Sequence, residues 1–366
     1  MVWRPQTSYA LSAGRLMMKL VVRPFENADS REEVARLHDW QSSEWRWLGN
    51  HPIADRIHRW VVDAGGEIVG HLAALPQYYR INGQRVVAHT PARYNVLPGY
   101  GFHAIALMRR FFRTCENCVT CDAVPAVIGI ETRLGAEEAG RLQSTTKLWN
   151  VAGVPGFPAS IPVPVTQLCN WGLQAVDRAL TTTILVDDFR VEVLEGFNEA
   201  FDDLFESVAA AVPCVVEKDA AFLRWRYGPD SPQSPVTVLG VSDGETLLGY
   251  AVLKFHRHTR HGRGDTAGYV LDLTTRPGRH DVARALLRGA VQHFRRLRVH
   301  SVRYRLIQSP SSPRSSDLWR LGFVAQRRRR SALLVKFADS ALHETAKDTA
   351  RWSYNHGDGE ASFWMT

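Results

Sequence analysis

The feature that most constrains the fold is an internal repeat in which similar residues recur 179 positions apart. This offset pairs Gly70 with Gly249, and Pro98 with Pro277. The remaining pairs at the same offset are Gly99 with Gly278, Ala104 with Ala283, Ala106 with Ala285, Leu107 with Leu286, and Arg109 with Arg288. A single register without a gap predicts two copies of one structural unit.

Each copy combines a strand meander with a helix. In the first copy, alternating runs at 59–64, 67–81 and 84–96 are separated by Gly65-Gly66 and by Asn82-Gly83, which is a strong hairpin signal. The Pro98-Gly99 turn and a helical pattern over 102–113 follow. The second copy repeats this order between 235 and 307. The pattern predicts an α+β fold in which each copy is a mixed, mostly antiparallel sheet flanked by helices.

The length agrees with two domains, because 366 residues exceed what one hydrophobic core usually serves. Residues 153–168 are dense in Pro and Gly without periodicity, which is typical of a linker. The expected division is a loose tail at 1–18, a first domain at 19–152, a linker and connecting helix at 153–185, a second domain at 186–340 and a C-terminal tail at 341–366.

The net charge of +8 suits an anionic partner such as nucleic acid, a membrane surface or a phosphate-bearing ligand. The 37 acidic residues are interspersed with the 45 basic ones, and only Gln326–Arg330 forms a basic run, so nucleic acid is not favoured, with tRNA as the exception discussed below. We find no run long enough to span a membrane and no signal-peptide core, and we expect a cytoplasmic protein.

Three of the five cysteines, Cys115, Cys118 and Cys121, have a spacing that invites a metal interpretation. A fourth ligand is not nearby, and the segment is expected to run from a helix end into a strand over 118–130, which points the three side chains in different directions. We therefore expect buried, apolar cysteines and no metal site.

The Pro98-Gly99 turn is a candidate anion site, since a helix N-terminus carries N–H groups without intrahelical partners and a partial positive charge. Close approach of a phosphate requires small side chains. The first copy has small residues at 99, 101, 104 and 106, whereas the second has His280 at one of the matching positions. The first turn is therefore expected to have more room.

These residues resemble the motif of the GNAT N-acyltransferase superfamily, V-x-P-x-x-[RQ]-x-x-G-x-[GA], here as a tandem duplication. The chain has Val96 and Pro98 in place, Gly101 at the Arg/Gln position, and Ala104 and Ala106 at the small positions. Stretches at 219–227 and 352–364 are also similar to bacterial GNAT-like proteins associated with surface-polysaccharide biosynthesis.

The resemblance implies acetyl-CoA or another acyl-CoA as cofactor and direct transfer of its acyl group to an amine of a small molecule or amino-sugar precursor. It implies that the pantetheine and the diphosphate contact Val96, Leu97, Gly99, Gly101, Phe102, His103, Ala104 and Ala106.

Two residues are candidate acid–base groups for this chemistry. Glu131 follows the apolar run VIGI at the expected strand end, and His71 lies on the meander facing the expected substrate site. The alternatives are a solvated strand end for Glu131 and a partly buried structural histidine for His71. Where the family often has a tyrosine that protonates the leaving thiolate, this chain has Trp149 and Trp319, which lack a phenol.

Asp272 lies inside an apolar strand pattern and needs a cationic partner, which we expect to be an arginine. Two other functions remain open at the level of the sequence. One is an aminoacyl-tRNA-dependent transferase on a similar doubled fold, which would use the positive charge. The other is a non-catalytic duplicated scaffold.

Overall fold

The computed structural model describes residues 20–26, 29–38, 42–151, 161–182, 189–260, 263–326 and 331–363. The expected N-terminal tail, residues 153–160 of the expected linker and the arginine run 327–330 lie outside this described part.

The strands are β1 (Leu20–Pro24), β2 (His58–Ala64), β3 (Ile68–Ile81), β4 (Gln84–Val96), β5 (Cys118–Asp122), β6 (Glu137–Arg141), β7 (Gln143–Leu148), β8 (Glu192–Leu194), β9 (Cys214–Val216), β10 (Thr237–Asp243), β11 (Thr246–Arg260), β12 (Arg263–Thr275), β13 (Ser301–Ile307), β14 (Val324–Ala325), β15 (Ala332–Lys336) and β16 (Trp352–Asn355). The α-helices are α1 (Arg31–His38), α2 (Ser42–Gly49), α3 (Phe102–Thr114), α4 (Pro125–Arg133), α5 (Val163–Thr182), α6 (Ala200–Ala211), α7 (Ala220–Tyr227), α8 (His280–Arg296), α9 (Ser315–Arg320), α10 (Ser340–Ala346) and α11 (Glu360–Phe363). Short 3-10 helices are η1 (Ala54–Arg56), η3 (Thr349–Arg351) and η4 (His356–Asp358).

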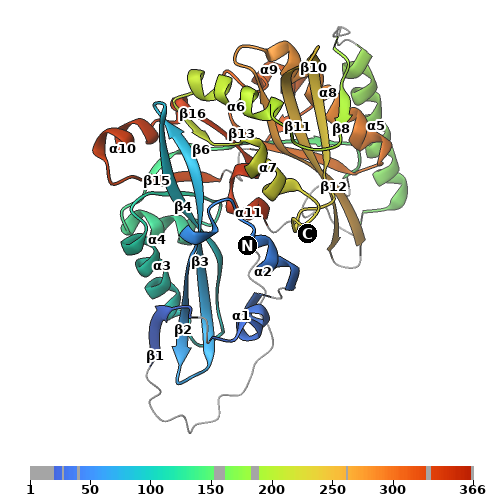
Figure 1. Cartoon of the computed structure of the whole chain (residues 1–366). Coiled ribbons are helices and arrows are strands. Elements are labelled where there is room, and N and C mark those ends of the chain that lie inside the picture. The colour runs from blue at the N-terminus through green and yellow to red at the C-terminus, as the bar shows by residue number, and fades with distance from the viewer. Residues whose placement is uncertain are drawn as a thin grey trace.

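One continuous sheet runs through both halves of the molecule, in the order β6-β15-β5-β4-β3-β9-β16-β13-β12-β11-β10-β8. Helices cover both faces of this sheet (Figure 1). The mixed sheet with flanking helices confirms the α+β fold class that the sequence predicts.

The same order of elements occurs twice along the chain. β2, β3 and β4 form an antiparallel meander, α3 follows, and β5 runs parallel to β4; β10, β11, β12, α8 and β13 repeat this arrangement. The pairing register also agrees, because Gly70 lies opposite Val96 and Gly249 lies opposite Thr275. The residue offset found in the sequence therefore corresponds to equivalent positions in the two meanders.

Three strands, β7, β9 and β15, pair with strands from the other half of the chain, β9 with β3. β7 pairs with β13 and β14, and β15 lies between β5 and β6. Each half of the sheet is thus completed by a strand from the other half of the sequence. The strand pairing crosses the division expected at residue 152.

The C-terminal residues form part of the sheet. Residues 341–366 were expected to be a tail, but within the described residues β16 inserts between β9 and β13, and η4 packs against β12. The buried side chains of Trp352 and Tyr354 account for this difference, since both aromatic rings leave solvent in this position.

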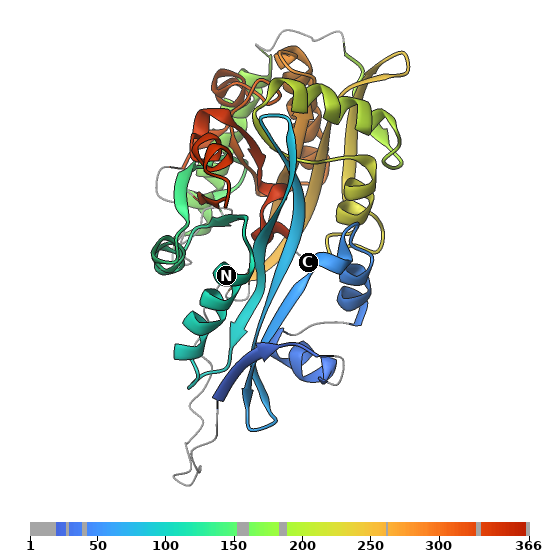
Figure 2. The same cartoon turned by 60° about the vertical axis from the view of Figure 1, so that its left-hand side comes forward.

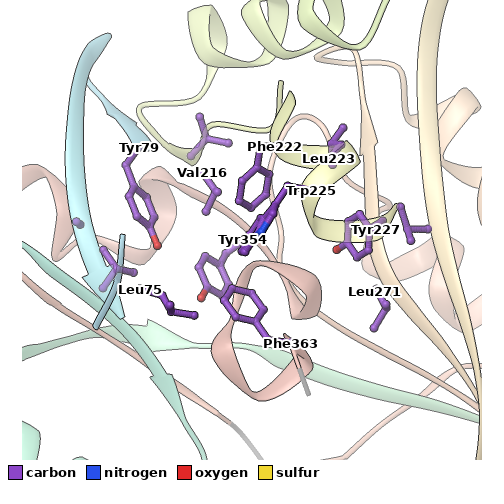
Figure 3. Packing of buried hydrophobic residues seen from close by; sticks show 14 of the residues in the cluster. Leu75, Tyr79, Val216, Phe222, Leu223, Trp225, Tyr227, Leu271, Tyr354 and Phe363 are labelled. Carbon is purple, nitrogen blue, oxygen red and sulfur yellow. The ribbon is translucent and has the colours of Figure 1, made fainter. Parts of the chain in front are cut away.

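An aromatic cluster fills the junction between the two halves (Figure 3). The rings of Trp47 and Trp225 stack with centroids 4.5 Å apart. Each indole N–H donates to the other residue's carbonyl oxygen, at 2.7 Å and 2.9 Å. Phe363 packs edge-on against both rings. The segment 219–227 therefore contributes Trp225 to the packing at this junction.

The expected strand over 118–130 is wrong beyond Asp122, because Pro125 occupies the first turn of α4. Proline is favoured at this position since its missing N–H has no intrahelical partner there. The cysteines before and within β5 are as expected: Cys115 and Cys118 are buried, and burial raises the pKa of the Cys115 thiol to about 12.

Candidate active site

The turn between β4 and α3 presents free backbone donors. Gly99 has a φ of 93°, and a Cβ atom built at Gly99 or Gly101 would meet nothing within 4 Å. The Leu97 amide donates to the Val69 carbonyl at 2.8 Å, which fixes the end of β4. Among the described residues, no acceptor contacts the amides of Gly101 and Phe102. These two N–H groups stand at the N-terminus of a helix of 13 residues, where an anion binds favourably.

β4 and β5 diverge beside this turn. Their parallel pairing consists of His89 with Cys118, and the His89 amide also donates to the Asn117 carbonyl at 2.9 Å. Beyond His89, β4 continues to Val96 without a further β5 partner in the described residues. Helix α11 packs against both strands, and the Arg93 amide lies 3.5 Å from the Glu360 carboxylate. The last residues of β4 thus have no β5 partner next to the turn, and α11 covers this edge at Arg93; we call this segment the open edge of β4.

The corresponding turn before α8 is closed. The Gly278 amide donates to the Pro310 carbonyl at 2.9 Å, and the Thr275 amide donates to the Ser311 carbonyl at 3.0 Å. His280 Nδ1 contacts the Ser312 carbonyl at 3.1 Å. The segment 310–312 therefore occupies the Gly278 amide, which corresponds to the Gly99 amide of the first turn, and the His280 amide, which corresponds to that of Gly101, donates to the Gly278 carbonyl at 2.9 Å.

The arginines that flank the second turn are also engaged. Arg276 Nε donates to the Leu247 carbonyl at 3.1 Å, and Arg279 forms an ion pair with Asp281 at 3.0 Å. Both guanidinium groups therefore already bond to acceptors within the protein.

Glu131 lies on α4 and is buried, so both its expected place at a strand end and the alternative of a solvated strand end are wrong. Its side chain is 1% exposed, and the Thr120 hydroxyl donates to its Oε2 at 2.9 Å. Burial raises the pKa of Glu131 to about 8, against the opposing effect of that hydrogen bond. A carboxyl group with a pKa close to neutral is suited to donate or accept a proton.

Tyr94, on β4, is a phenol that the sequence reasoning missed. Burial raises its pKa, and the nearby charge of Glu131 adds to this increase. The phenol therefore lies within electrostatic reach of the carboxyl group. The two tryptophans considered in its place are elsewhere: the indole of Trp149 donates to Asp177 at 2.9 Å, and Trp319 is 69% exposed on α9.

His71 is fully buried on β3 and contacts α1. His38 Nε2 and His71 Nδ1 are 3.0 Å apart, and His71 Nδ1 lies 3.2 Å from the Arg93 carbonyl oxygen. Burial lowers the pKa of His71 to about 3 and that of His38 to about 2, so both imidazoles are neutral at physiological pH.

The structure does not bring His71 and Glu131 together on one face of the sheet. His71 contacts α1, whereas Glu131 belongs to α4. α1 and α2 cover one face of β3 and β4, and α3 and α4 lie on the other (Figure 2). Near the open edge of β4, Thr120 instead donates to Glu131, and Tyr94 lies within electrostatic reach of that carboxyl group.

β4 has a bulge at Arg93, the residue whose carbonyl oxygen contacts His71, close to the open edge of β4. The register between β3 and β4 shifts between His71 and Ala73, and Arg93 has a φ of 48° at this point. A positive φ is strained for a residue with a side chain, and bulges of this kind often reorient groups beside active sites. The Arg93 guanidinium forms an ion pair with Glu44 at 2.6 Å, which holds the strained residue in place.

A buried polar network lies on β12, the strand of the second meander that corresponds to β4. Asp272 pairs with Lys218 at 3.0 Å, rather than with the arginine expected from the sequence, and Lys218 also pairs with Asp358 at 3.2 Å. The Tyr250 hydroxyl and the Asn355 amide group donate to the Asp272 carboxylate at 3.0 Å and 2.9 Å. Lys218 thus pairs with both carboxylates, and the network joins β12 to the C-terminal segment.

The described residues contain no group of three or more His, Cys, Asp or Glu side chains placed to hold a metal ion. Within the same residues, no helix combines the length and apolar character needed to cross a membrane.

Comparisons with known proteins support the fold. No family model and no curated protein sequence matches the chain. Among solved structures, a GCN5-related N-acetyltransferase from Anabaena variabilis matches with a TM-score of 0.57 at 14% identity, over 88% of this chain and 74% of that one. Saccharomyces cerevisiae N-myristoyltransferase with bound myristoyl-CoA matches with a TM-score of 0.57 at 9% identity, over 88% and 83% of the two chains.

A third match is a GCN5-related N-acetyltransferase from Kribbella flavida, with a TM-score of 0.53 at 15% identity over 89% of this chain and 72% of that one. At such low identities the likeness concerns the fold alone. The chain therefore has the fold of the GCN5-related N-acetyltransferases and of N-myristoyltransferase, along most of its length.

Proposed function

We propose that the protein is an acyl-CoA-dependent N-acyltransferase and that the turn before α3 binds the diphosphate of the cofactor. The observation that carries this proposal is the pair of free amides at Gly101 and Phe102, directly beside the open edge of β4. The fold neighbours are N-acyltransferases, and one of them was solved with an acyl-CoA bound. The full binding segment is Val96, Leu97, Gly99, Gly101, Phe102, His103, Ala104 and Ala106.

The proposed reaction is direct transfer. The pantetheine amides would pair with the open edge of β4, which places the thioester near Tyr94 and Glu131. The acceptor amine, after losing a proton, attacks the thioester carbonyl; a C–N bond forms, the C–S bond breaks, and the thiolate takes up a proton. Tyr94 is the proposed proton donor to the thiolate, and Glu131 the proposed acid–base group that exchanges protons with the amine.

His71 is proposed as a positioning residue instead of a base. Its Nδ1 already contacts both His38 and the Arg93 carbonyl oxygen, and its pKa is lowered by burial to about 3. The neutral imidazole of His71 fixes the β4 bulge at Arg93. The bulge in turn positions the end of β4, which leads into the turn.

The proposal also covers the acyl donor, the acceptor, the compartment and the origin of the two meanders. The donor is acetyl-CoA, and the acceptor is an amine of a small molecule or an amino-sugar precursor of the polysaccharide-associated type, in the cytoplasm. The two meanders are proposed to be a tandem duplication, in which the closed turn at Gly278 marks the copy that shapes the acceptor site and does not bind cofactor.

Calorimetric titration with acetyl-CoA and with a long-chain acyl-CoA tests the cofactor assignment. Ala104→Trp places a bulky ring over the free amides, and Gly101→Pro removes one N–H at a φ of −53°, which proline accepts. Both variants should lose about tenfold or more in affinity. Phe102→Ala is the matched control, because it shortens a side chain that is 90% exposed and keeps the backbone amide.

No heat from the wild-type protein with either thioester at millimolar concentration would defeat the cofactor assignment. Binding without turnover on any amine would instead identify a non-catalytic protein of this fold.

A further inference from the structure

Helix α5 has its polarity reversed relative to an ordinary surface helix. The residues at 166, 170, 173 and 177 are the most buried along its described length, and three of these four are polar. The Asn170 side chain accepts a hydrogen bond from the Val151 amide at 2.8 Å. On the opposite side, Trp171 is 78% exposed and Leu168 is 72% exposed. A soluble helix normally places such residues against the core.

The exposed large apolar residues of α5 lie along its solvent-facing side. They are Val163, Val165, Leu168, Trp171 and Val176, and the helix carries no charged residue from Val163 to Val176. We call these five residues the α5 surface. Large exposed apolar areas on the surface of a soluble protein often mark interaction sites.

A basic cavity adjoins the C-terminal part of α5. It has a volume of about 380 Å³ and is lined by Arg178, Arg295 and Arg298, together with the neutral side chains of Trp149, Asn150 and Gln174. Its one carboxylate, Asp177, is already paired with both Lys147 and Arg295. The cavity therefore offers net positive charge beside an uncharged apolar surface.

We propose that the α5 surface and the adjoining basic cavity dock the protein onto an anionic lipid bilayer. Leucine and tryptophan side chains enter the boundary between headgroups and acyl chains, and arginines at the same level attract lipid phosphates. A second copy of the chain fits less well, because a two-fold contact through α5 sets the same arginines of the two copies near one another. The net charge of +8 adds to the attraction toward anionic lipid.

The position of α5 leaves the proposed acyl-CoA turn accessible during docking. α5 lies at the edge of the molecule near β8 and β10, whereas α3 lies at the opposite end of the sheet (Figure 1). The inference does not depend on the proposed acyl transfer, and either one can fail without the other.

Co-sedimentation of the full chain with vesicles tests the proposal. Vesicles of neutral phosphatidylcholine are compared with vesicles that also hold about 30% phosphatidylglycerol, since anionic lipid supplies the electrostatic part of the attraction. The wild-type protein should bind the anionic vesicles, and Leu168→Glu/Trp171→Glu should lower the bound fraction about tenfold. Arg178→Gln/Arg298→Gln should weaken binding and reduce its salt dependence. Trp319→Glu is the matched control, because this tryptophan is 69% exposed on α9 and should leave binding unchanged.

Three results would overturn the inference. The first is equal sedimentation of wild type and Leu168→Glu/Trp171→Glu. The second is binding of inorganic phosphate by the basic cavity with no vesicle binding, which indicates a soluble phosphorylated ligand. The third is a dimer in light scattering that Trp171→Glu converts to a monomer, which identifies a second copy as the occupant. Circular dichroism of each variant shows that the fold is retained.

Discussion

At the scale of single residues, the chemistry of the proposed site depends on Glu131. Its carboxyl is buried and accepts one hydrogen bond from Thr120, and burial raises its pKa to about 8. The folded state therefore holds a proton that the unfolded chain releases near pH 4.5. The associated stability is fully present below the unfolded value and is lost as the pH rises through the folded value.

Glu131→Gln should remove this pH dependence. Between pH 6 and pH 9 the wild-type protein should lose about 2 kcal/mol of unfolding free energy that the variant keeps. Urea unfolding of both proteins at the two pH values measures the difference. Parallel stability curves for the two proteins would show that Glu131 titrates in its ordinary range.

Tyr94→Phe tests the proposed proton donor. The variant keeps the buried ring and removes the hydroxyl, so acyl-CoA affinity should stay within about twofold while kcat falls about 100-fold. Steady-state kinetics and calorimetry separate the two effects. An unchanged kcat would exclude the phenol from proton transfer.

Residue-level prediction from the sequence succeeded where the local pattern decides the structure. The small residues of the first turn and the apolar cysteines follow directly from local sequence. Tyr94 was missed because its importance comes from the bulge at Arg93, a tertiary feature with no sequence signature. Glu131 was misplaced because a short apolar run fits both a strand and a helix.

At the scale of elements, the turns before α3 and α8 share their backbone geometry but differ in exposure. Gly99 and Gly278 have φ values of 93° and 78°, in the region where a side chain is strained. Gly99→Ala and Gly278→Ala should each cost about 1 kcal/mol, although neither added methyl group meets a neighbouring atom.

Gly101→Ala is the matched comparison for these two variants. Its φ of −53° suits any residue, and the site is equally open, so the change should cost less than about 0.5 kcal/mol. Chemical denaturation of the three variants gives the ranking. Equal costs at all three positions would contradict the account of these turns.

The elements themselves were predictable to different degrees. The meanders and the helices after each turn were expected from alternation and from helical periodicity. The places of β7, β15 and β16 in the sheet were not, because strand pairing between distant segments leaves no local pattern.

At the scale of the whole molecule, the crossing strands make the two halves interdependent. β15 lies between β5 and β6, and the edge of β13 is covered by β7. The stacked Trp47 and Trp225 also join segments from both halves. We therefore expect the chain to unfold in one cooperative transition.

A fragment of residues 1–152 should not fold alone, because it lacks β15 and its aromatic partners from the second half. Co-expression with residues 153–366 should restore a soluble complex with native-like circular dichroism. A stable, monodisperse fragment 1–152 would contradict the interdependence of the halves.

The most direct test of the central claim is a crystal structure of the protein with acetyl-CoA. We predict that the diphosphate oxygens lie within hydrogen-bonding distance of the Gly101 and Phe102 amides, with the pantetheine along the edge of β4 beyond His89. Cofactor bound at the turn before α8, or cofactor whose diphosphate leaves the Gly101 and Phe102 amides without a partner, would contradict the account.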